Sequence, residues 1–266
     1  MKGDTLNVIV VKLGGSVFDS RDTTLTDMVS LQKSGYRLIV VHGGAKMVTG
    51  WCADLGIKSQ FHEGERVTDR KSLDVVTAVL AGLANKETVA AIIRAGGRAV
   101  GLSGVDGGLV KGRVRDTKLG YIGEVTQVNP DVLNALLSVG FMPLVSPVSF
   151  NDTTDVNEPL LLNINGDTVA GDIAAAIRSS KLIYLTDVTG IRGADGNVLE
   201  IINAAEALAL LESGIAAGGM IPKLKSCITA SRAGVTCHII DGRRPHALTE
   251  AVTGRVTGTT VPGEMT

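Results

Sequence analysis

The stretch VVKLGGSV, residues 10–17, begins as an apolar run and then places Lys12 directly before the turn that holds Gly14 and Gly15. Glycines let backbone N–H groups approach an anion closely, and a lysine adds a point charge, so this stretch can form a phosphate cradle. The alternative is a strand that ends in an ordinary turn with a solvated lysine. The spacing GxxxxGK[ST] of a P-loop is absent from it, so other segments must decide between these two interpretations.

Apolar runs of the same kind recur along the chain, with helical stretches between them. They are LNVIVVK, RLIVVH, GRAVGLS, FMPLVSP, KLIYLTD and VTCHII, which begin at residues 6, 37, 97, 141, 181 and 235. Runs that are apolar throughout suit strands buried on both faces, and intervening helices indicate parallel crossovers. The sequence therefore predicts α/β architecture. Residues 109–128 (LVKGRVRDTKLGYIGEVTQV) instead predict an inserted antiparallel hairpin that can form a flap near the site.

Composition excludes several classes of protein. The 266 residues are 44% hydrophobic and 20% charged, and 26 Lys and Arg balance 27 Asp and Glu, so nothing in the net charge favours nucleic acid or an anionic membrane as a partner. The segment MKGDTLN is too short and polar for a signal peptide, and no apolar run approaches the length of a membrane span, so we expect a cytoplasmic protein. Three cysteines without metal-like spacing predict reduced, mostly buried thiols.

A second glycine turn repeats the pattern of the first. In VVHGGAKM, residues 40–47, a buried strand leads into Gly43 and Gly44 and then into a helix. Open α/β sheets bind ligands at the carboxyl ends of their strands, so the two turns can face one ligand, although each alone is equally typical of a tight strand-to-helix connection. His42 is interpreted as a packed histidine at the end of the strand rather than as a base.

Three further segments carry candidate binding residues. GERVTDR, residues 64–70, places Arg66 in a polar loop, where it can bind a carboxylate or be solvated. LLLNINGDTVAGD places Asn163 and Asp167 at a strand end and a helix start, where an aspartate is often only a cap. GGMIPKLKS places Lys223 at a helix start, where it opposes the helix dipole unless an anion binds there. Two lysines, glycine turns and an aspartate are what phosphoryl transfer requires.

Eight segments in order resemble the amino-acid kinase family over roughly residues 8–260. They are VVKLGGSV, VVHGGAKM, GERVTDR, GLSGVDGG, LGYIGEV, NINGD, YLTDVTGI and GGMIPKLKS. The resemblance implies a three-layer αβα sandwich with a mostly parallel central sheet. It also implies two parts, residues 1–178 for binding the amino-acid substrate and for dimerisation, and residues 179–266 for binding ATP.

The resemblance also assigns roles to the candidate residues. Lys12 and Lys223 would stabilise the transferring phosphoryl group and the ATP phosphates, and Asp167 would hold the two lysines in place. The remaining assignments are Gly43, Gly44, Arg66 and Asn163 for the amino-acid substrate, and Gly14, Gly15, Thr186 and Asp187 for the nucleotide. The resemblance implies no metal ligands in the protein, because Mg²⁺ arrives with ATP.

The reaction implied is ATP-dependent phosphorylation of the γ-carboxylate of N-acetyl-L-glutamate, a step of arginine biosynthesis. Glu65 stands where relatives usually carry an apolar residue, and it leaves open a kinase of lysine biosynthesis that acts on aminoadipate or glutamate linked to a carrier protein. A catalytically silent sensor with the same fold is a third alternative, although both lysines and the aspartate are retained. A Rossmann dehydrogenase is disfavoured because no GxGxxG follows the first strand.

The resemblance further bears on assembly and feedback. Relatives inhibited by arginine carry an extra N-terminal helix that links dimers into a hexamer, and the early first strand expected here favours a homodimer. Val256 stands where those relatives usually place a glycine, so we expect activity that is indifferent to arginine.

Overall fold

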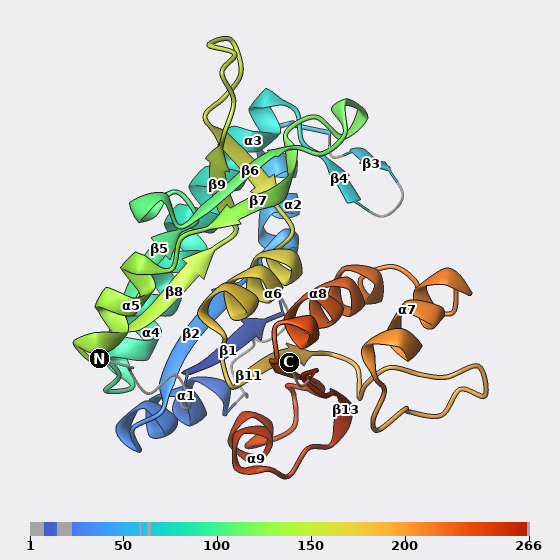
Figure 1. Cartoon of the computed structure of the whole chain (residues 1–266). Helices are drawn as coiled ribbons and strands as arrows, with labels where there is room; N and C mark the ends of the chain where they lie inside the picture. Colours follow the sequence, from blue (N-terminus) through green and yellow to red (C-terminus); the bar gives the residue numbers. More distant parts are fainter. Residues whose placement is uncertain (1–7, 15–22, 59, 63–64, 265–266) are drawn as a thin grey trace.

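A sheet of seven strands runs through the middle of the molecule (Figure 1). The computed structural model describes residues 8–14, 23–58, 60–62 and 65–264, with the backbone alone at positions 61, 62, 65 and 66. In spatial order the strands are β13 (Gly258–Val261), β12 (Thr236–Asp241), β11 (Lys181–Thr186), β1 (Val8–Leu13), β2 (Arg37–His42), β8 (Met142–Ser146) and β5 (Ala99–Ser103).

Six of these strands are parallel, and β13 pairs antiparallel with β12 at one edge. The six parallel strands are the six apolar runs predicted from the sequence, so the α/β prediction is confirmed. The sequence did not predict β13, whose residues GTTV contain a glycine and two hydroxyl side chains instead of an apolar run.

The sheet separates two hydrophobic cores. Val8 and Val10 of β1 belong to the core on one face, whereas Ile9 and Val11 belong to the core on the other, as the alternation of side chains along a strand requires. The first face is covered by α5 (Asp131–Ser138), α6 (Gly166–Ile177), α7 (Ala204–Glu212) and α8 (Met220–Arg232), and the second by α1 (Thr24–Lys33), α4 (Asn85–Arg94) and α9 (Ala247–Thr253). This arrangement is a three-layer αβα sandwich, as the family resemblance implied.

A small barrel and a short hairpin lie beyond the carboxyl ends of β2 and β8 (Figure 1). The four strands of the closed barrel are β6 (Val110–Val114), β7 (Ile122–Val128), β9 (Val148–Asn151) and β10 (Leu161–Ile164). Strands β6 and β7 are antiparallel, which confirms the predicted hairpin. The other elements here are β3 (Gln60–His62), β4 (Glu65–Val67) and two short 3₁₀ helices, η3 (Asp106–Gly108) and η4 (Thr117–Leu119).

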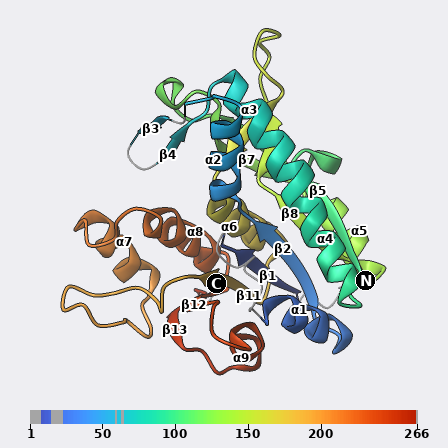
Figure 2. The same ribbon diagram turned by 180° about the vertical axis from the view of Figure 1, so that it is seen from behind.

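One long helix runs along strands β8 and β5, as the view from behind shows (Figure 2). It comprises α3 (Arg70–Val76), the π-helical segment η2 (Thr77–Ala84) and α4, and α2 (Ala45–Asp54) packs beside it. By length and composition it could cross a membrane, since its mean hydropathy reaches 1.4 over 18 residues, of which 39% are buried. This differs from the expectation that no apolar run approaches that length. Apolar residues of the helix pack in both the α2 core and the second sheet core, as in a core helix of a folded domain.

Candidate active site

A cavity of about 500 Å³ opens at the carboxyl ends of β1, β2 and β11. Most of the predicted site residues line it, namely Lys12, Gly14, Gly43, Gly44, Asn163, Asp167, Thr186, Asp187 and Lys223. Two predicted positions fall outside the described part of the structure, Gly15 and the side chain of Arg66. Residues distant in the sequence thus meet at the edge of the sheet where open α/β folds bind their ligands.

Lys12 lies one residue before the end of β1, on the same face of the sheet as Val8 and Val10. Its side chain therefore points toward the helices of the first face, and it is only 11% exposed. The Nζ atom of Lys12 is 2.6 Å from Oδ1 of Asp167. The burial and the ion pair exclude the alternative of a solvated lysine beside an ordinary turn.

Asp167 lies in the first turn of α6, but it is not the cap of that helix. The N-cap is Asn165, whose side-chain oxygen accepts a hydrogen bond of 2.8 Å from the backbone N–H of Asp167. Because Asn165 supplies the cap, the Asp167 carboxylate is available for both lysines. Its Oδ2 atom accepts a hydrogen bond of 2.9 Å from Nζ of Lys223. Asp167 is therefore not the cap of its helix, and its carboxylate contacts both lysines that the resemblance places beside it.

Lys223 lies in the first turn of α8, as the sequence predicts. The helix begins at Met220 after Gly219, it has no side-chain cap, and its first turn contains no acidic residue. Lys223 also donates a hydrogen bond of 3.2 Å to the carbonyl of Gly219, which holds the ammonium group at the helix start. A cation and uncapped N–H groups at one helix end suit the binding of an anion.

The three charged groups form a buried triad with two ammonium groups on one carboxylate. Burial alone would raise the pKa of Asp167, but the adjacent charges of Lys12 and Lys223 outweigh it, so the pKa of Asp167 is lowered. Two ammonium groups and one carboxylate carry a net charge of +1. The triad therefore offers a positively charged site, with little water around it, to a transferring phosphoryl group.

The turn of Gly43 and Gly44 connects β2 to α2. Gly44 has a φ of 157°, and a Cβ atom at this position would lie 2.7 Å from Cδ2 of Leu80. Both the backbone angle and the close contact require glycine there. Gly44 is also the N-cap of α2, which lacks a side-chain cap and has no acidic residue in its first turn. Backbone N–H groups at this helix start can therefore bind an anionic ligand.

His42 stabilises this glycine turn and does not act as a base. Its Nδ1 atom lies 2.9 Å from the carbonyl oxygen of Gly43, so Nδ1 carries the proton and donates. Its Nε2 atom lies 3.1 Å from Nδ2 of Asn85 and accepts from that amide. Burial, with smaller contributions from Lys12 and Lys86, lowers the pKa of His42. The packed, neutral histidine matches the interpretation made from the sequence.

Asn163 lies in β10, on the barrel side of the cavity. Its Nδ2 atom donates a hydrogen bond of 3.1 Å to Oγ1 of Thr68. Thr68 follows β4, the strand that contains Arg66, by one residue, and it is bridged to Gly120 of the barrel hairpin. Asn163 is thus linked to the segment of Arg66, which is the other residue predicted to bind a carboxylate.

Thr186 and Asp187 line the cavity at the end of β11. Oγ1 of Thr186 accepts a hydrogen bond of 2.9 Å from the N–H of Val188, which turns the chain away from the sheet. Gly14 donates its N–H to the carbonyl of Leu185 at 3.1 Å, so the first glycine turn is joined to the end of β11. The two segments therefore form one continuous wall.

Lys46 is a cavity residue that the sequence interpretation missed. It lies in the first turn of α2, directly after the second glycine turn, and it lines the cavity. A signal for it was present, because Lys46 opposes the dipole of its helix in the same way as Lys223 does.

The described residues contain no group of three or more His, Cys, Asp or Glu side chains that could hold a metal ion. Both carboxylate oxygens of Asp167 are occupied by lysines. The three cysteines are buried and unpaired, as predicted.

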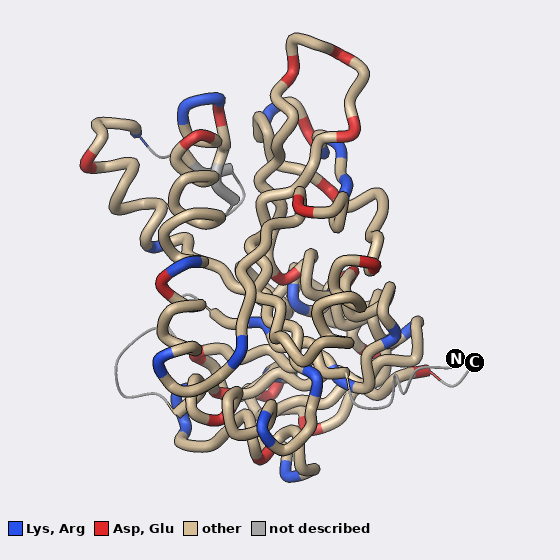
Figure 3. The backbone as a smooth tube through the Cα atoms, turned by 90° about the vertical axis from the view of Figure 1, so that its left-hand side faces the viewer, with Lys and Arg blue, Asp and Glu red and all other residues tan. Residues whose placement is uncertain are grey.

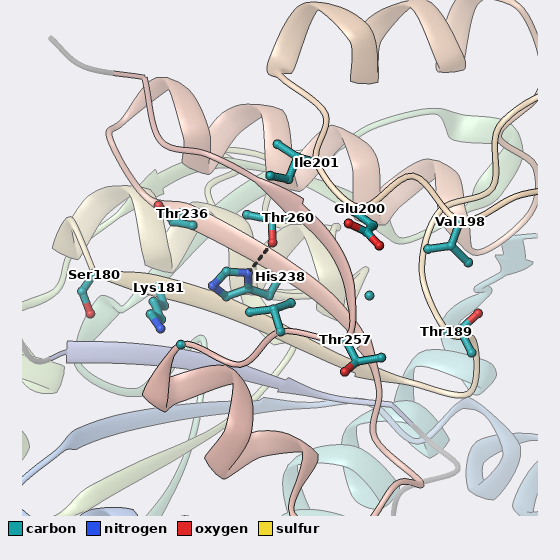
Figure 4. A pocket seen from close by; sticks show the side chains of 13 residues that line it. Ser180, Lys181, Thr189, Val198, Glu200, Ile201, Thr236, His238, Thr257 and Thr260 are labelled. Atoms are coloured by element: carbon teal, nitrogen blue, oxygen red, sulfur yellow. Dashed lines mark hydrogen bonds between the residues drawn. The ribbon is translucent and has the colours of Figure 1, made fainter.

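A second cavity, of about 740 Å³, lies beside β12 and β13 on the second face of the sheet, the one that α1, α4 and α9 cover (Figure 4). His238 and Thr260 project into it, with Nδ1 of His238 3.1 Å from Oγ1 of Thr260. Burial, and to a lesser extent the charge of Lys181, lowers the pKa of His238 to about 4. This cavity contains none of the triad residues, so the smaller cavity is the candidate active site.

The chain is similar in sequence to known proteins over most of its length. The sequence model described as Amino acid kinase family matches residues 7–241. The acetylglutamate kinase of Dehalococcoides mccartyi strain BAV1 is 49% identical over 262 residues, which are 97% of this chain and 95% of that protein. The acetylglutamate kinase of Thermosynechococcus vestitus is 44% identical over 247 residues, which are 90% of this chain and 82% of that protein.

Solved structures share the same fold. The structure of smu.665 from Streptococcus mutans UA159 aligns with a TM-score of 0.80 and 26% identity, over 97% of this chain and 99% of that chain. Carbamate kinase from Giardia lamblia bound to AMP-PNP aligns with a TM-score of 0.71 over 97% of this chain and 99% of that chain, at 17% identity. At that identity the second likeness concerns the fold alone.

Proposed function

The chain belongs to the amino acid kinase family, and we propose that it transfers the terminal phosphoryl group of ATP to the γ-carboxylate of N-acetyl-L-glutamate. The products are ADP and N-acetyl-L-glutamyl 5-phosphate, and the reaction is a step of arginine biosynthesis. Relatives named acetylglutamate kinase match nearly the whole chain at 44 to 49% identity. The observation that carries the proposal is the buried triad of Lys12, Asp167 and Lys223 at the carboxyl edge of the sheet.

The chemistry needs charge stabilisation more than proton transfer. A substrate carboxylate is ionised near neutral pH, so it can attack the terminal phosphorus of ATP without a general base. One oxygen–phosphorus bond forms while the bond to the bridging oxygen breaks, and ADP leaves with that electron pair. The electrostatic obstacle is the approach of two anions. Lys12 and Lys223 offset it, and Asp167 orients both ammonium groups.

The glycine turns would supply backbone donors for the same step. We assign Gly43 and Gly44 to the amino-acid substrate, and Gly14 and Gly15 to the nucleotide. The uncapped start of α2 at Gly44 supports the first assignment, because its N–H groups face no side-chain acceptor of their own helix.

Arg66 and Asn163 are our candidates for holding the carboxylates of N-acetyl-L-glutamate. An arginine can bind a carboxylate through two parallel hydrogen bonds, and an asparagine amide can donate one. The hydrogen bond from Asn163 to Thr68 supports the binding of one substrate by both residues, because Thr68 follows Arg66 closely in the chain.

The nucleotide is assigned to the part of the chain formed by residues 179–266, and the amino acid and the dimer contact to residues 1–178. Thr186 and Asp187 would contact ATP, since they line the cavity on the side of β11. Mg²⁺ would enter as part of the nucleotide substrate, bound to the phosphates of ATP.

We further propose a cytoplasmic homodimer. Leu83 and Ile93 lie on the long helix with exposures of 37% and 54%, and Trp51 on α2 is 45% exposed. These side chains are our candidates for the contact between the two chains. Light scattering that returned two chains would agree with the proposal, and a monomer would contradict it.

A coupled assay of ADP release tests the function. Activity with N-acetyl-L-glutamate should exceed activity with glutamate, aspartate or carrier-linked aminoadipate by at least about tenfold in kcat/KM. Charges of both signs are interspersed along the chain (Figure 3), which supports a free amino-acid substrate over an acidic carrier protein. Preference for the carrier-linked substrate would overturn the proposed substrate. Absence of ADP release with all four substrates would indicate a silent sensor.

A further inference from the structure

Tyr184 is a fully buried tyrosine in β11, the strand beside β1. In the parallel pairing of these strands Tyr184 is the register partner of Lys12. Paired residues of neighbouring strands project to the same face, so both side chains point toward α6 and α8. Tyr184 therefore lies directly beside the catalytic triad, although the proposed mechanism gives it no role.

The hydroxyl group of Tyr184 joins the two helices that carry the triad. It lies 3.1 Å from the backbone carbonyl of Asp167 in α6. It also contacts Oγ of Ser226 in α8, and Ser226 in turn lies 2.8 Å from the backbone carbonyl of Lys223. The backbone carbonyls of the two residues whose side chains form an ion pair thus lie at the two ends of a chain of two hydroxyl groups.

The two helices cannot approach each other more closely at this point. A Cβ atom at Gly171 of α6 would lie 2.5 Å from Cβ of Ser226 and 3.0 Å from its Cα. The helices therefore touch where the hydroxyl chain crosses between them. Because protein interiors are packed densely, the distance that the two hydroxyl groups span between the helices is fixed. A change in that distance would shift Asp167 relative to Lys223.

The two hydroxyl groups have fewer protons than oxygen–oxygen contacts. Tyr184 and Ser226 have one hydroxyl proton each, and the chain contains three oxygen–oxygen contacts. The hydroxyls can donate in series toward Lys223 or in series toward Asp167, so one of the two carbonyls accepts at a time. Burial, together with the nearby Cys227 and Asp167, raises the pKa of Tyr184, so its hydroxyl stays protonated and both orders remain available.

We propose that Tyr184 and Ser226 are positioning residues that hold the backbones of Asp167 and Lys223 at the spacing that phosphoryl transfer needs. The proposal rests on the function proposed above. It assigns the hydroxyl chain to the alignment of the triad and not to substrate binding, because neither residue lines the active-site cavity.

Steady-state kinetics of Tyr184→Phe and Ser226→Ala test the proposal. Phenylalanine keeps the ring in place and leaves Ser226 bonded to Lys223, so the variant should fold. Each variant should lower kcat about tenfold and leave KM for both substrates within about twofold, because alignment is lost and binding is not. The loss of kcat in the double variant should be about as large as in either single variant, since each single substitution already breaks the same chain of hydroxyl groups.

Ser231→Ala is the matched control, because Ser231 also lies buried in α8 and donates 2.6 Å to a backbone carbonyl, that of Pro262. Its kcat should equal that of the wild type. Equal losses in Ser231→Ala and Ser226→Ala, or an unchanged kcat in folded Tyr184→Phe, would overturn the proposal. An inactive wild-type protein would instead refute the proposed function, so the two failures are distinguishable.

Discussion

Removal of the Lys223 ammonium group should abolish most of the turnover without unfolding the protein. We choose Lys223→Met because methionine retains the apolar stem that packs in α8. The side chain of Lys223 is 17% exposed, and its Nζ atom is 2.9 Å from Oδ2 of Asp167. The triad carries a net charge of +1 with both lysines and of zero with Lys12 alone. The variant therefore loses the whole net charge that faces the phosphoryl group.

The expected loss follows from the electrostatics of the triad. A unit charge about 4 Å from a developing charge contributes roughly 4 kcal/mol at an effective dielectric constant of about 20. This free energy corresponds to a decrease in kcat of about 10³-fold. Asp167 keeps its ion pair with Lys12 at 2.6 Å, so the carboxylate is not left as an unpaired buried charge.

The ADP-release assay at saturating concentrations of both substrates measures the change in kcat. Lys225→Met is the matched control, because Lys225 lies two residues further along α8 on its exposed side. The control should keep the turnover of the wild type. A folded Lys223→Met variant with kcat within about tenfold of the wild type would refute the charge argument, since that loss is only about 1.4 kcal/mol.

Three further changes test other features of the molecule. The pKa of His238 is lowered from 6.5 to about 4, so the unfolded chain binds more protons than the folded protein between these pH values. The contribution of the neutral His238 to stability is therefore fully present above pH 6.5 and is lost as the pH falls toward 4. Between pH 8 and pH 5 the free energy of unfolding, measured with urea, should fall by about 2 kcal/mol less in His238→Gln than in the wild type. An equal fall in both proteins would refute this explanation. Burial raises the pKa of Asp172 from 3.8 to about 6, so the folded state favours the neutral form, and Asp172→Asn should stabilise the protein by about 1–2 kcal/mol at pH 8 and not at pH 4. A gain at both pH values would contradict that cause. Arg66→Ala should weaken binding of N-acetyl-L-glutamate by about 1.5–3 kcal/mol and leave ATP binding unchanged; calorimetry that showed weaker ATP binding would reassign this residue.

Local sequence was informative where a structural feature depends on neighbouring residues. Asn203 followed three residues later by Glu206 encodes the capping box that begins α7, with both reciprocal hydrogen bonds present. The hairpin of β6 and β7 was readable for the same reason, because its strands adjoin in the chain. Such contacts form between groups that the chain already holds close together.

Local sequence was ambiguous at Asp167. An aspartate in the first turn of a helix can cap that helix or bind a charge elsewhere, and both arrangements suit NINGD equally. The side chain of Asn165 takes the cap and leaves the Asp167 carboxylate for the lysines. Which asparagine or aspartate oxygen reaches which donor depends on the path of β10 into α6, and no pattern of residues encodes that path.

The sequence by itself determined the parallel α/β core, because strands buried on both faces must be apolar throughout and therefore stand out as continuous runs. It also identified the lysines and the glycine turns as candidates, since a lysine at a helix start opposes the helix dipole and glycines let backbone N–H groups approach an anion. The family resemblance grouped Lys12, Asp167 and Lys223, but only the tertiary structure supplied the contacts of the triad and the hydroxyl groups of Tyr184 and Ser226 between its backbones. The pairs Lys12–Asp167, Asp167–Lys223 and Tyr184–Ser226 are separated by 155, 56 and 42 positions, and strand order and helix packing, rather than local preference, bring them within hydrogen-bond distance.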